Sequence, residues 1–269
     1  MTKTRLDVAL VERSLCESRQ KAQAAIMAGL VTVNGQKVTK AGAGVLETDA
    51  IAVKGPAIPY VSRGGLKLEK AMKLWNIDLT GKICADIGAS TGGFSDCMLQ
   101  CGAAKVYAVD TGYGKLDWKI RTDPRVVALE RTNARYLTRE QVPDPLDFAS
   151  VDVSFISLRL ILPALRGVLC PGGEAVCLVK PQFEAGRENV GKKGVVKDPA
   201  IHLQVLEHFL DHAKENGFSV KELTFSPIKG PEGNIEYLGH ILTSEIPLQN
   251  IDLKKLVEES HQTLEEAKV

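Results

Sequence analysis

Four ionisable residues stand at points of the chain where acid–base chemistry is expected. Asp152 follows one apolar, strand-like run, Lys180 follows the next, and Glu236 lies on the last. Lys67 lies on a helical segment that precedes the first strand. A lysine can act as a general base when burial and a neighbouring cation disfavour its ammonium form. We therefore expect a catalytic group in which Lys180 is the base, Lys67 is the neighbouring cation, and the two carboxylates hold both.

A glycine-rich turn joins an apolar strand to a helical segment within residues 83–99. Its glycines read Gly-x-x-x-Gly-Gly, which differs from the Gly-x-Gly-x-x-Gly pattern that binds a dinucleotide. Asp86 precedes the turn, and Asp110 follows the next strand about 20 residues on, where an acid can hold ribose hydroxyls. This arrangement resembles the S-adenosylmethionine site of class I methyltransferases; an ordinary strand-to-helix turn with an exposed aspartate is the alternative. The candidate cofactor-binding residues are Asp86, Gly88, Ser90, Gly92, Gly93, Phe94, Asp110 and Asn133.

Length and composition indicate a globular protein with one large and one small domain. The chain has 269 residues, of which 44% are hydrophobic and 25% are charged, close to the average for folded soluble proteins. The longest apolar region, residues 153–165, is too short to span a membrane, and no apolar signal segment follows the N-terminus. We therefore expect a soluble, cytoplasmic protein. His208 and His212 have no third ligand nearby, so no metal site is expected.

Basic residues are concentrated near the N-terminus. Residues 1–60 hold eight lysines and arginines against five acidic residues, a net charge of +3, whereas the rest of the chain holds 26 against 28, a net charge of −2. This distribution is expected if the N-terminal part binds phosphates. Two short amphipathic helices, a hairpin at Asn34-Gly35 and a strand at 49–53 make this part a compact unit, which ends at a linker rich in proline.

The segment 18–38 resembles the small RNA-binding domain first described in the ribosomal protein S-four family. Helix, glycine stop, strand and Asn-Gly turn follow one another in the order of that family, over about residues 4–54. The residues that the resemblance implies for binding structured RNA are Arg5, Arg19, Lys21 and Lys37. A solvated pair of basic helices is the alternative. The expected domains are residues 1–58, with a linker from about residue 55, and residues 63–269.

Strand and helix patterns alternate from residue 83 onward, as βαβ units require. The expected strands begin at residue 83 and continue at 106–109, 126–129, 146–153, 175–179, 218–225 and 235–242, with helices at 158–169 and 201–215 and a loop at 184–199. This order predicts an α/β fold: a Rossmann-like, seven-stranded, mostly parallel sheet with a C-terminal antiparallel strand, together with a small α+β domain. The glycines and basic residues of the long loop suggest mobility and a polyanionic partner; a plain surface insertion is the alternative.

Five motifs give a more specific resemblance. They are Ser-Arg-Gly-Gly-Leu-Lys-Leu, Asp-Ile-Gly-Ala-Ser-Thr-Gly-Gly-Phe, Asp-Val-Ser-Phe-Ile-Ser-Leu, Val-Lys-Pro-Gln-Phe-Glu and Gly-Val-Val-Lys-Asp-Pro. With the order Lys67, Asp152, Lys180, Glu236, they resemble the TlyA family of the FtsJ/RrmJ class. The resemblance implies transfer of a methyl group from S-adenosylmethionine to the ribose 2′-hydroxyl of cytidine in ribosomal RNA, with these four residues as the catalytic tetrad.

Other functions fit the sequence less well. Amino-group methyltransferases carry an Asn/Asp-Pro-Pro-aromatic run where this chain has Asp152-Val-Ser-Phe, and a pyrimidine-carbon acceptor would need a nucleophilic cysteine, for which only Cys170-Pro171 is a candidate. The haemolysin label of the family would need a membrane-inserting helix, which is not evident. A catalytically inactive RNA-binding protein of ribosome assembly is disfavoured by the complete tetrad. We expect ribosomal RNA as the partner, with no membrane and no stable protein partner.

Overall fold

The computed structural model describes residues 3–16, 18–27, 29–53, 58–247 and 249–266. The chain divides into two compact units, Met1–Ala57 and Ile58–Val269, each described here by itself. The linker expected from about residue 55 falls largely on 54–57, outside the described residues.

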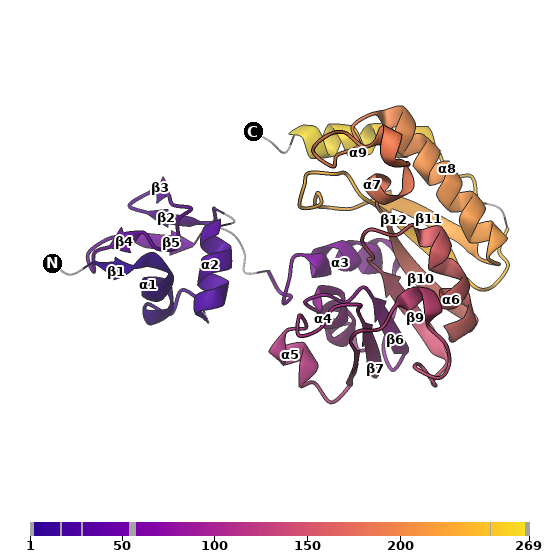
Figure 1. Ribbon diagram of the computed structural model, residues 1–269, viewed down its shortest axis with the longest axis horizontal. Coiled ribbons are helices and arrows are strands. Elements are labelled where there is room, and N and C mark those ends of the chain that lie inside the picture. The colour runs from indigo at the N-terminus through magenta and orange to yellow at the C-terminus, as the bar shows by residue number, and fades with distance from the viewer. Residues whose placement is uncertain (1–2, 17, 28, 54–57, 248, 267–269) are drawn as a thin grey trace. The chain divides into compact units, whose positions relative to one another are not determined.

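The N-terminal unit contains two helices and short antiparallel strands (Figure 1). Its elements are β1 (Thr4–Arg5), α1 (Leu6–Glu12), α2 (Arg19–Met27), β2 (Val31–Val33), β3 (Gln36–Lys37), β4 (Gly44–Val45) and β5 (Ile51–Val53). The Ser18 hydroxyl accepts a hydrogen bond from Lys21 N and caps α2. Asn34 and Gly35 have φ values of 51° and 80°, as a tight turn between β2 and β3 requires. The predicted order of helices, hairpin and strand is confirmed.

The C-terminal unit is built on a seven-stranded sheet in the order β11-β12-β10-β9-β6-β7-β8. Its strands are β6 (Ile83–Ile87), β7 (Lys105–Val109), β8 (Val126–Leu129), β9 (Leu146–Val151), β10 (Leu169–Val179), β11 (Ser219–Phe225) and β12 (Tyr237–Leu242). Neighbours from β10 to β8 are parallel, whereas β12 runs antiparallel to both β10 and β11. The predicted mostly parallel sheet with a C-terminal antiparallel strand is confirmed.

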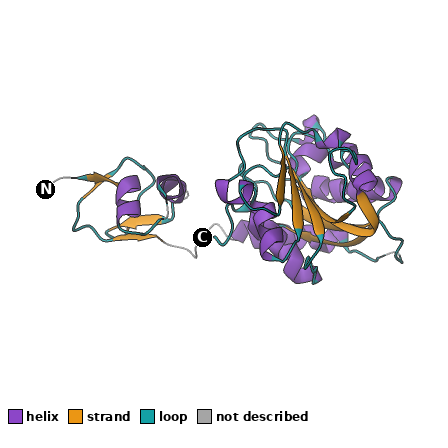
Figure 2. Ribbon diagram, turned by 90° about the horizontal axis from the view of Figure 1, so that it is seen from below, coloured by secondary structure: helices purple, strands orange, loops and turns teal. Residues whose placement is uncertain are grey.

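Helices cover both faces of this sheet (Figure 2). They are α3 (Gly64–Trp75), α4 (Gly93–Gln100), α5 (Trp118–Arg121), α6 (Leu162–Val168), α7 (Pro181–Glu184), α8 (Pro199–Glu215) and α9 (Leu253–Glu266), with 3₁₀ turns at Ala134–Tyr136, Leu158–Leu160 and Arg187–Asn189. Side chains alternate along the strands: Cys177 and Val179 of β10 join the core beneath α6, α8 and α9, and Val176 and Leu178 join the core beneath α3, α4 and α5.

Two elements differ from the expectation. The helix predicted at 158–169 is a 3₁₀ turn followed by α6, because Pro163 lies in the first turn, where its missing N–H leaves no bond unmade. The segment 170–173, expected to be a turn before the strand, is an irregular part of β10, where the pairing with β9 shifts register between Leu169 and Glu174. Helices α5, α7 and α9 were not predicted.

Candidate active site

The four residues of the predicted tetrad form two ion pairs. Lys67 Nζ lies 2.6 Å from Glu236 Oε2, and Lys180 Nζ lies 2.5 Å from Asp152 Oδ1. Lys180 Nζ also donates to Ser154 Oγ at 3.1 Å. The structure thus brings together, in two separate pairs, residues that are up to 169 positions apart in the sequence.

The sheet explains how these residues meet. Asp152 directly follows β9 and Lys180 directly follows β10, and parallel strands end at the same edge of a sheet. Because β12 is antiparallel, its first residue, Tyr237, pairs with the last residue of β10, Val179. Glu236 therefore reaches the same edge from the opposite chain direction. Lys67 lies on α3, which packs on the face of the sheet that carries Val176 and Leu178.

Burial differs between the two pairs. The side chains of Lys67 and Glu236 are 9% and 1% exposed, so this pair is almost closed to solvent. The side chain of Lys180 is also 9% exposed, but its partner Asp152 is 20% exposed. The second pair is therefore the more open one.

A cavity of about 420 Å³ adjoins this edge of the sheet. Its lining residues are Ser62, Arg63, Gly64, Lys67, Asp86, Gly88, Ala89, Ser90, Thr91, Gly93, Phe94, Asp152, Ile228, Lys229, Gly230 and Pro231. The lining includes one member of each ion pair, Lys67 and Asp152, together with most of the predicted glycine turn. It also includes residues that the sequence analysis did not assign, in the segment 62–64 and in the loop 228–231. The segment 62–64 belongs to the motif Ser-Arg-Gly-Gly-Leu-Lys-Leu, which could have indicated it. The loop 228–231 contains proline and glycine and has no periodic pattern from which a role in the site could be predicted.

Gly88 allows the turn after β6 to approach the strand end that carries Asp152. Its φ is +92°, and a Cβ at this position would lie 2.3 Å from the backbone oxygen of Asp152. No other residue type fits such an approach without displacing backbone. Gly92 also has a φ of +92°, directly before α4, while Gly93 lies against Ser62, just before α3.

Asp86 is fully buried, and both of its carboxylate oxygens have partners within the protein. Oδ2 accepts from the N–H and the hydroxyl of Ser95 at 2.8 and 2.7 Å, and Oδ1 accepts from the Ser150 hydroxyl at 3.2 Å. Burial raises the pKa of Asp86 to about 6, although the serine bonds oppose this rise. Asp86 lines the cavity, yet its contacts are those of a residue that fixes the first turn of α4.

Asp110 binds the glycine turn from the neighbouring strand. Its Oδ2 accepts from Ser90 N at 2.8 Å, and its Oδ1 accepts from Gly112 N at 2.6 Å. Each carboxylate oxygen retains a second acceptor position, so hydroxyl groups of a ligand could still bind there. Asn133 is exposed, is not part of the cavity lining, and accepts from Arg135 N at 3.0 Å. The structure therefore places Asp110 in contact with Ser90, which lines the cavity, whereas neither Asp110 nor Asn133 is itself among the lining residues.

These residues fit the cofactor that the sequence motif implies. The cavity volume lies within the usual range for small-molecule sites, roughly 300–1,000 Å³. Gly88 and Gly93 keep the turn open where a Cβ would meet neighbouring atoms, Phe94 contributes an apolar wall, and Asp110 provides a carboxylate beside Ser90. An adenosine group needs an apolar wall for its base, a closely approaching backbone, and a carboxylate that can accept from its ribose hydroxyls.

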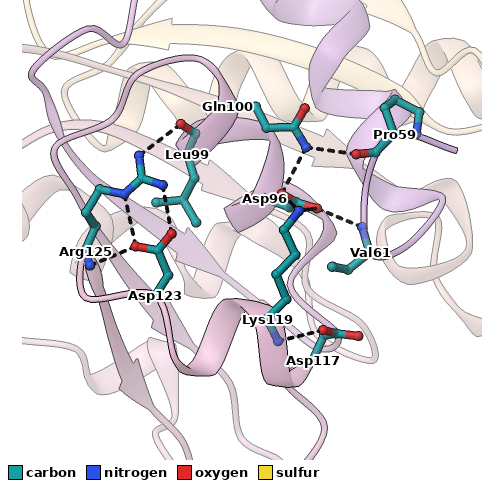
Figure 3. Close-up of polar contacts among 9 residues, drawn as sticks. All are labelled: Pro59, Val61, Asp96, Leu99, Gln100, Asp117, Lys119, Asp123 and Arg125. Carbon is teal, nitrogen blue, oxygen red and sulfur yellow. Dashed lines mark hydrogen bonds and ion pairs between the residues drawn. The ribbon is translucent and has the colours of Figure 1, made fainter. Parts of the chain in front are cut away.

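Asp96 on α4 anchors residues 59–61, which directly precede the cavity-lining residue Ser62 (Figure 3). Its carboxylate is buried and accepts from Val61 N at 2.9 Å, from Lys119 Nζ at 3.0 Å and from Gln100 Nε2 at 3.0 Å. Gln100 in turn donates to the Pro59 carbonyl at 2.8 Å. These bonds fix the residues just before Ser62, a role that no sequence pattern had indicated.

An exposed aromatic side chain follows Asp152. Phe155 is 91% exposed and has a φ of +64°, a conformation that costs free energy for a bulky residue. Its ring lies 5.1 Å from the ring of Phe183, and Lys180 Nζ lies 5.9 Å from the Phe183 ring. The protein thus holds an apolar ring in solvent, in a strained backbone, three residues after Asp152.

The candidate RNA-binding residues of the N-terminal unit are all at its surface. Arg5 and Arg19 donate to the same buried carboxylate, that of Asp7, at 3.0 and 2.9 Å, and remain 53% and 55% exposed. Arg5, together with Gln23 and Arg19, holds the pKa of Asp7 well below its usual range. Lys21 and Lys37 are exposed, and the stem of Lys37 covers Gly29. Both arginines are thus held in fixed positions, which a pattern of charges along the sequence could not indicate.

Comparison with known proteins agrees with these motifs. Residues 60–241 match the family described as FtsJ-like methyltransferase, and residues 4–51 match the S4 domain. The protein YqxC of Bacillus subtilis (strain 168) is 52% identical over 274 residues, covering 99% of this chain and 97% of that protein. The 16S/23S rRNA (cytidine-2'-O)-methyltransferase TlyA of Mycobacterium tuberculosis is 44% identical over 236 residues, covering 87% of this chain and 88% of that enzyme. The resemblances stated from the sequence motifs are confirmed.

A solved structure extends the comparison. A hemolysin-labelled protein from Streptococcus thermophilus is 46% identical and has a TM-score of 0.80, covering 100% of this chain and 99% of that one. In the part of this chain that the structure describes, no helix combines the length and apolar character needed to cross a membrane.

Proposed function

Because the chain belongs to the FtsJ-like methyltransferase family and carries an S4 domain, we propose that it methylates the ribose 2′-hydroxyl of a cytidine in ribosomal RNA. The observation that carries this proposal is the pair of buried lysine–carboxylate contacts beside the glycine-lined cavity. The name of the Mycobacterium tuberculosis relative supports the choice of acceptor. Because ribosomal subunits are the proposed substrate, we expect the reaction to take place in the cytoplasm.

The methyl donor of this proposal is S-adenosylmethionine, which supplies a methyl group already activated by a sulfonium. Gly88, Gly93 and Phe94 would surround it, and Asp110 would accept from its ribose hydroxyls. Alignment of the acceptor oxygen with the methyl group then accounts for much of the rate, because the two reactants are held in a reactive geometry.

The acceptor hydroxyl needs a base, and Lys180 is our choice for it. The Lys180–Asp152 pair is the more open of the two, and Asp152 lines the cavity. A hydroxyl entering beside Asp152 would lie near the Lys180 amine, whose Ser154 contact fixes its position. Lys67, whose ammonium group is held by Glu236, lines the same cavity and would help to position the acceptor there.

The substrate base has a candidate contact in Phe155. Sequence-specific RNA recognition commonly places unstacked bases on exposed aromatic rings. Phe155 is exposed, close in sequence to Asp152, and in tilted ring contact with Phe183. The S4 domain, with Arg5 and Arg19 at its surface, would bind a more distant part of the same RNA.

Substitution of Lys180 by arginine tests the base. Arginine keeps the positive charge that Asp152 needs but, with a pKa above about 12, does not accept a proton at neutral pH. We expect Lys180→Arg to bind S-adenosylmethionine and ribosomal subunits normally and to lose methyl transfer by about 100-fold or more. The measurement is transfer of labelled methyl to ribosomal subunits under single-turnover conditions.

Lys67→Arg provides the matched comparison, because it also keeps a cation opposite a carboxylate. A larger loss for Lys67→Arg than for Lys180→Arg would transfer the role of base to Lys67. Absence of methyl transfer by the wild-type chain, with RNA binding retained, would instead favour the inactive RNA-binding protein.

A further inference from the structure

A second cavity, of about 660 Å³, lies next to the first. It is formed by the segment 189–197 and the loop 229–235, with His261 of α9. Lys229 lines both cavities, so the loop that carries it is their common wall. A ligand long enough to extend past this loop could occupy the two at once.

The second cavity is strongly basic. Its lining contains Lys192, Lys193, Lys197 and Lys229 but only one acid, Glu232. Lys192, Lys193 and Lys197 are exposed, and no ion pair within the described residues involves any of the four lysines. Four ammonium groups around one hollow repel one another, and they are stabilised when an anion binds among them.

The walls of this cavity are fixed by buried hydrogen bonds. Asn234 is 1% exposed; its side chain accepts from Val196 N at 3.0 Å and donates to Gly194 O at 2.8 Å. His202 Nε2 lies 3.0 Å from Val196 O, so this nitrogen donates, and Nδ1 accepts from the Tyr237 hydroxyl at 2.8 Å. The lysines therefore project from a backbone that is tied to the strand following Glu236, and not from an unattached loop.

We propose that the second cavity binds backbone phosphates of the substrate RNA close to the target nucleotide. The inference rests on the proposed function, because the first cavity must hold the methyl donor and the target ribose. Lysines bind phosphates as point charges without reading sequence, which suits a contact that positions an RNA strand. Charge complementarity and the shared Lys229 wall favour an RNA strand over a separate small anion.

The test uses the full chain with Lys192→Gln, Lys193→Gln and Lys197→Gln combined. All three side chains are exposed, so the fold should be retained, and Lys229 is kept because it also lines the first cavity. The control combines Lys214→Gln, Lys254→Gln and Lys255→Gln, which removes the same charge from exposed positions on α8 and α9. Each protein is assayed for methyl transfer to ribosomal subunits, for binding to protein-free ribosomal RNA over a range of salt, and for S-adenosylmethionine affinity by calorimetry.

We expect the cavity variant to raise KM for subunits by about tenfold or more, with kcat and S-adenosylmethionine affinity unchanged, and to reduce the slope of log affinity against log salt by about 2. The control should stay within about twofold of the wild type. A wild-type KM and salt slope would overturn the proposal, as would a loss of S-adenosylmethionine affinity. A deficit seen with subunits but not with protein-free RNA would assign the cavity to an acidic ribosomal protein and also overturn it. If the wild type methylates no RNA, the proposed function fails, whereas the salt slopes still decide the phosphate site.

Discussion

Lys67 and Glu236 form a charged pair that is almost wholly removed from water, and such pairs have a characteristic mutational signature. Removing one partner leaves a buried charge, which typically costs about 3–5 kcal/mol of unfolding free energy. We expect Lys67→Met to show this loss and the double variant Lys67→Met/Glu236→Leu to recover much of it. Urea unfolding of the two proteins measures the difference.

Neither variant should methylate RNA, because both lack Lys67, a proposed member of the catalytic tetrad that lines the cavity. The pair would then be retained for chemistry and not for stability. A double variant that unfolds as easily as Lys67→Met alone would contradict the account of a buried, mutually compensating pair.

Asp86 makes the stability of the C-terminal unit depend on pH. Its folded pKa of about 6 lies above the unfolded value of 3.8, so the folded state binds the proton more tightly. The stabilisation from this group is complete below about pH 4 and is lost as pH rises through about 6, by roughly 3 kcal/mol in total. We expect Asp86→Asn, which stays neutral, to match or exceed the wild-type stability at pH 7 and to lose that advantage by pH 4.

The measurement is the difference in unfolding free energy between wild type and Asp86→Asn at several pH values, in which the titration of all other groups cancels. A difference that does not change between pH 4 and 7 would mean that Asp86 is not desolvated as the structure describes. Binding of S-adenosylmethionine to Asp86→Asn should persist, because both carboxylate oxygens of Asp86 already have partners within the protein.

The turn between β6 and α4 depends on Gly88 for a reason that is distinct from its backbone conformation. Gly81 also has a positive φ, +73°, but a Cβ there would have no neighbour within 4 Å. Both Gly81→Ala and Gly88→Ala should lose about 1 kcal/mol of stability from φ alone. Only Gly88→Ala must also displace the backbone at Asp152.

We therefore expect Gly88→Ala to reduce both S-adenosylmethionine affinity and methyl transfer by at least about tenfold, the scale of a 1.4 kcal/mol effect. Gly81→Ala should keep both near wild type. Calorimetry and initial rates separate the two variants. Equal behaviour of the two alanine variants would remove the close approach to Asp152 from the explanation of the site.

Elements with a strong local pattern were predictable, and elements that depend on distant partners were not. The glycine turn with its flanking strand could be read from apolar runs and glycines. Helix α9 could not, because its buried stripe includes Ser260, whose polar partner Tyr237 is 23 residues away. The same limit applies to the site: motif order named the candidate residues of the tetrad, but the pairing of Lys67 with Glu236 depends on the antiparallel placement of β12.

The two units have separate cores, which predicts what each can do alone. Among the described residues, the core of the N-terminal unit contains Leu6, Leu10 and Ile26, and the two cores of the C-terminal unit are built from residues from 60 onward. We expect residues 58–269 to fold and to bind S-adenosylmethionine with nearly full affinity. They should methylate ribosomal subunits far less well, because the S4 domain no longer contributes its charge to RNA binding.

Comparison of the full chain and residues 58–269 in calorimetry and in methyl transfer to subunits checks this expectation. Full activity of the shorter chain would show that the S4 domain has another role.

The edges of the large sheet bear on how molecules of this protein behave toward one another. The pairing of edge strand β11 with β12 shifts register between Val220 and Glu222, which leaves Lys221 out of the regular ladder, and the opposite edge strand, β8, has only four residues. A bulge carrying a lysine and a short strand both hinder the addition of a foreign strand. Growth of the sheet from one molecule into the next is therefore obstructed at both ends, which protects the protein against aggregation through its sheet edges.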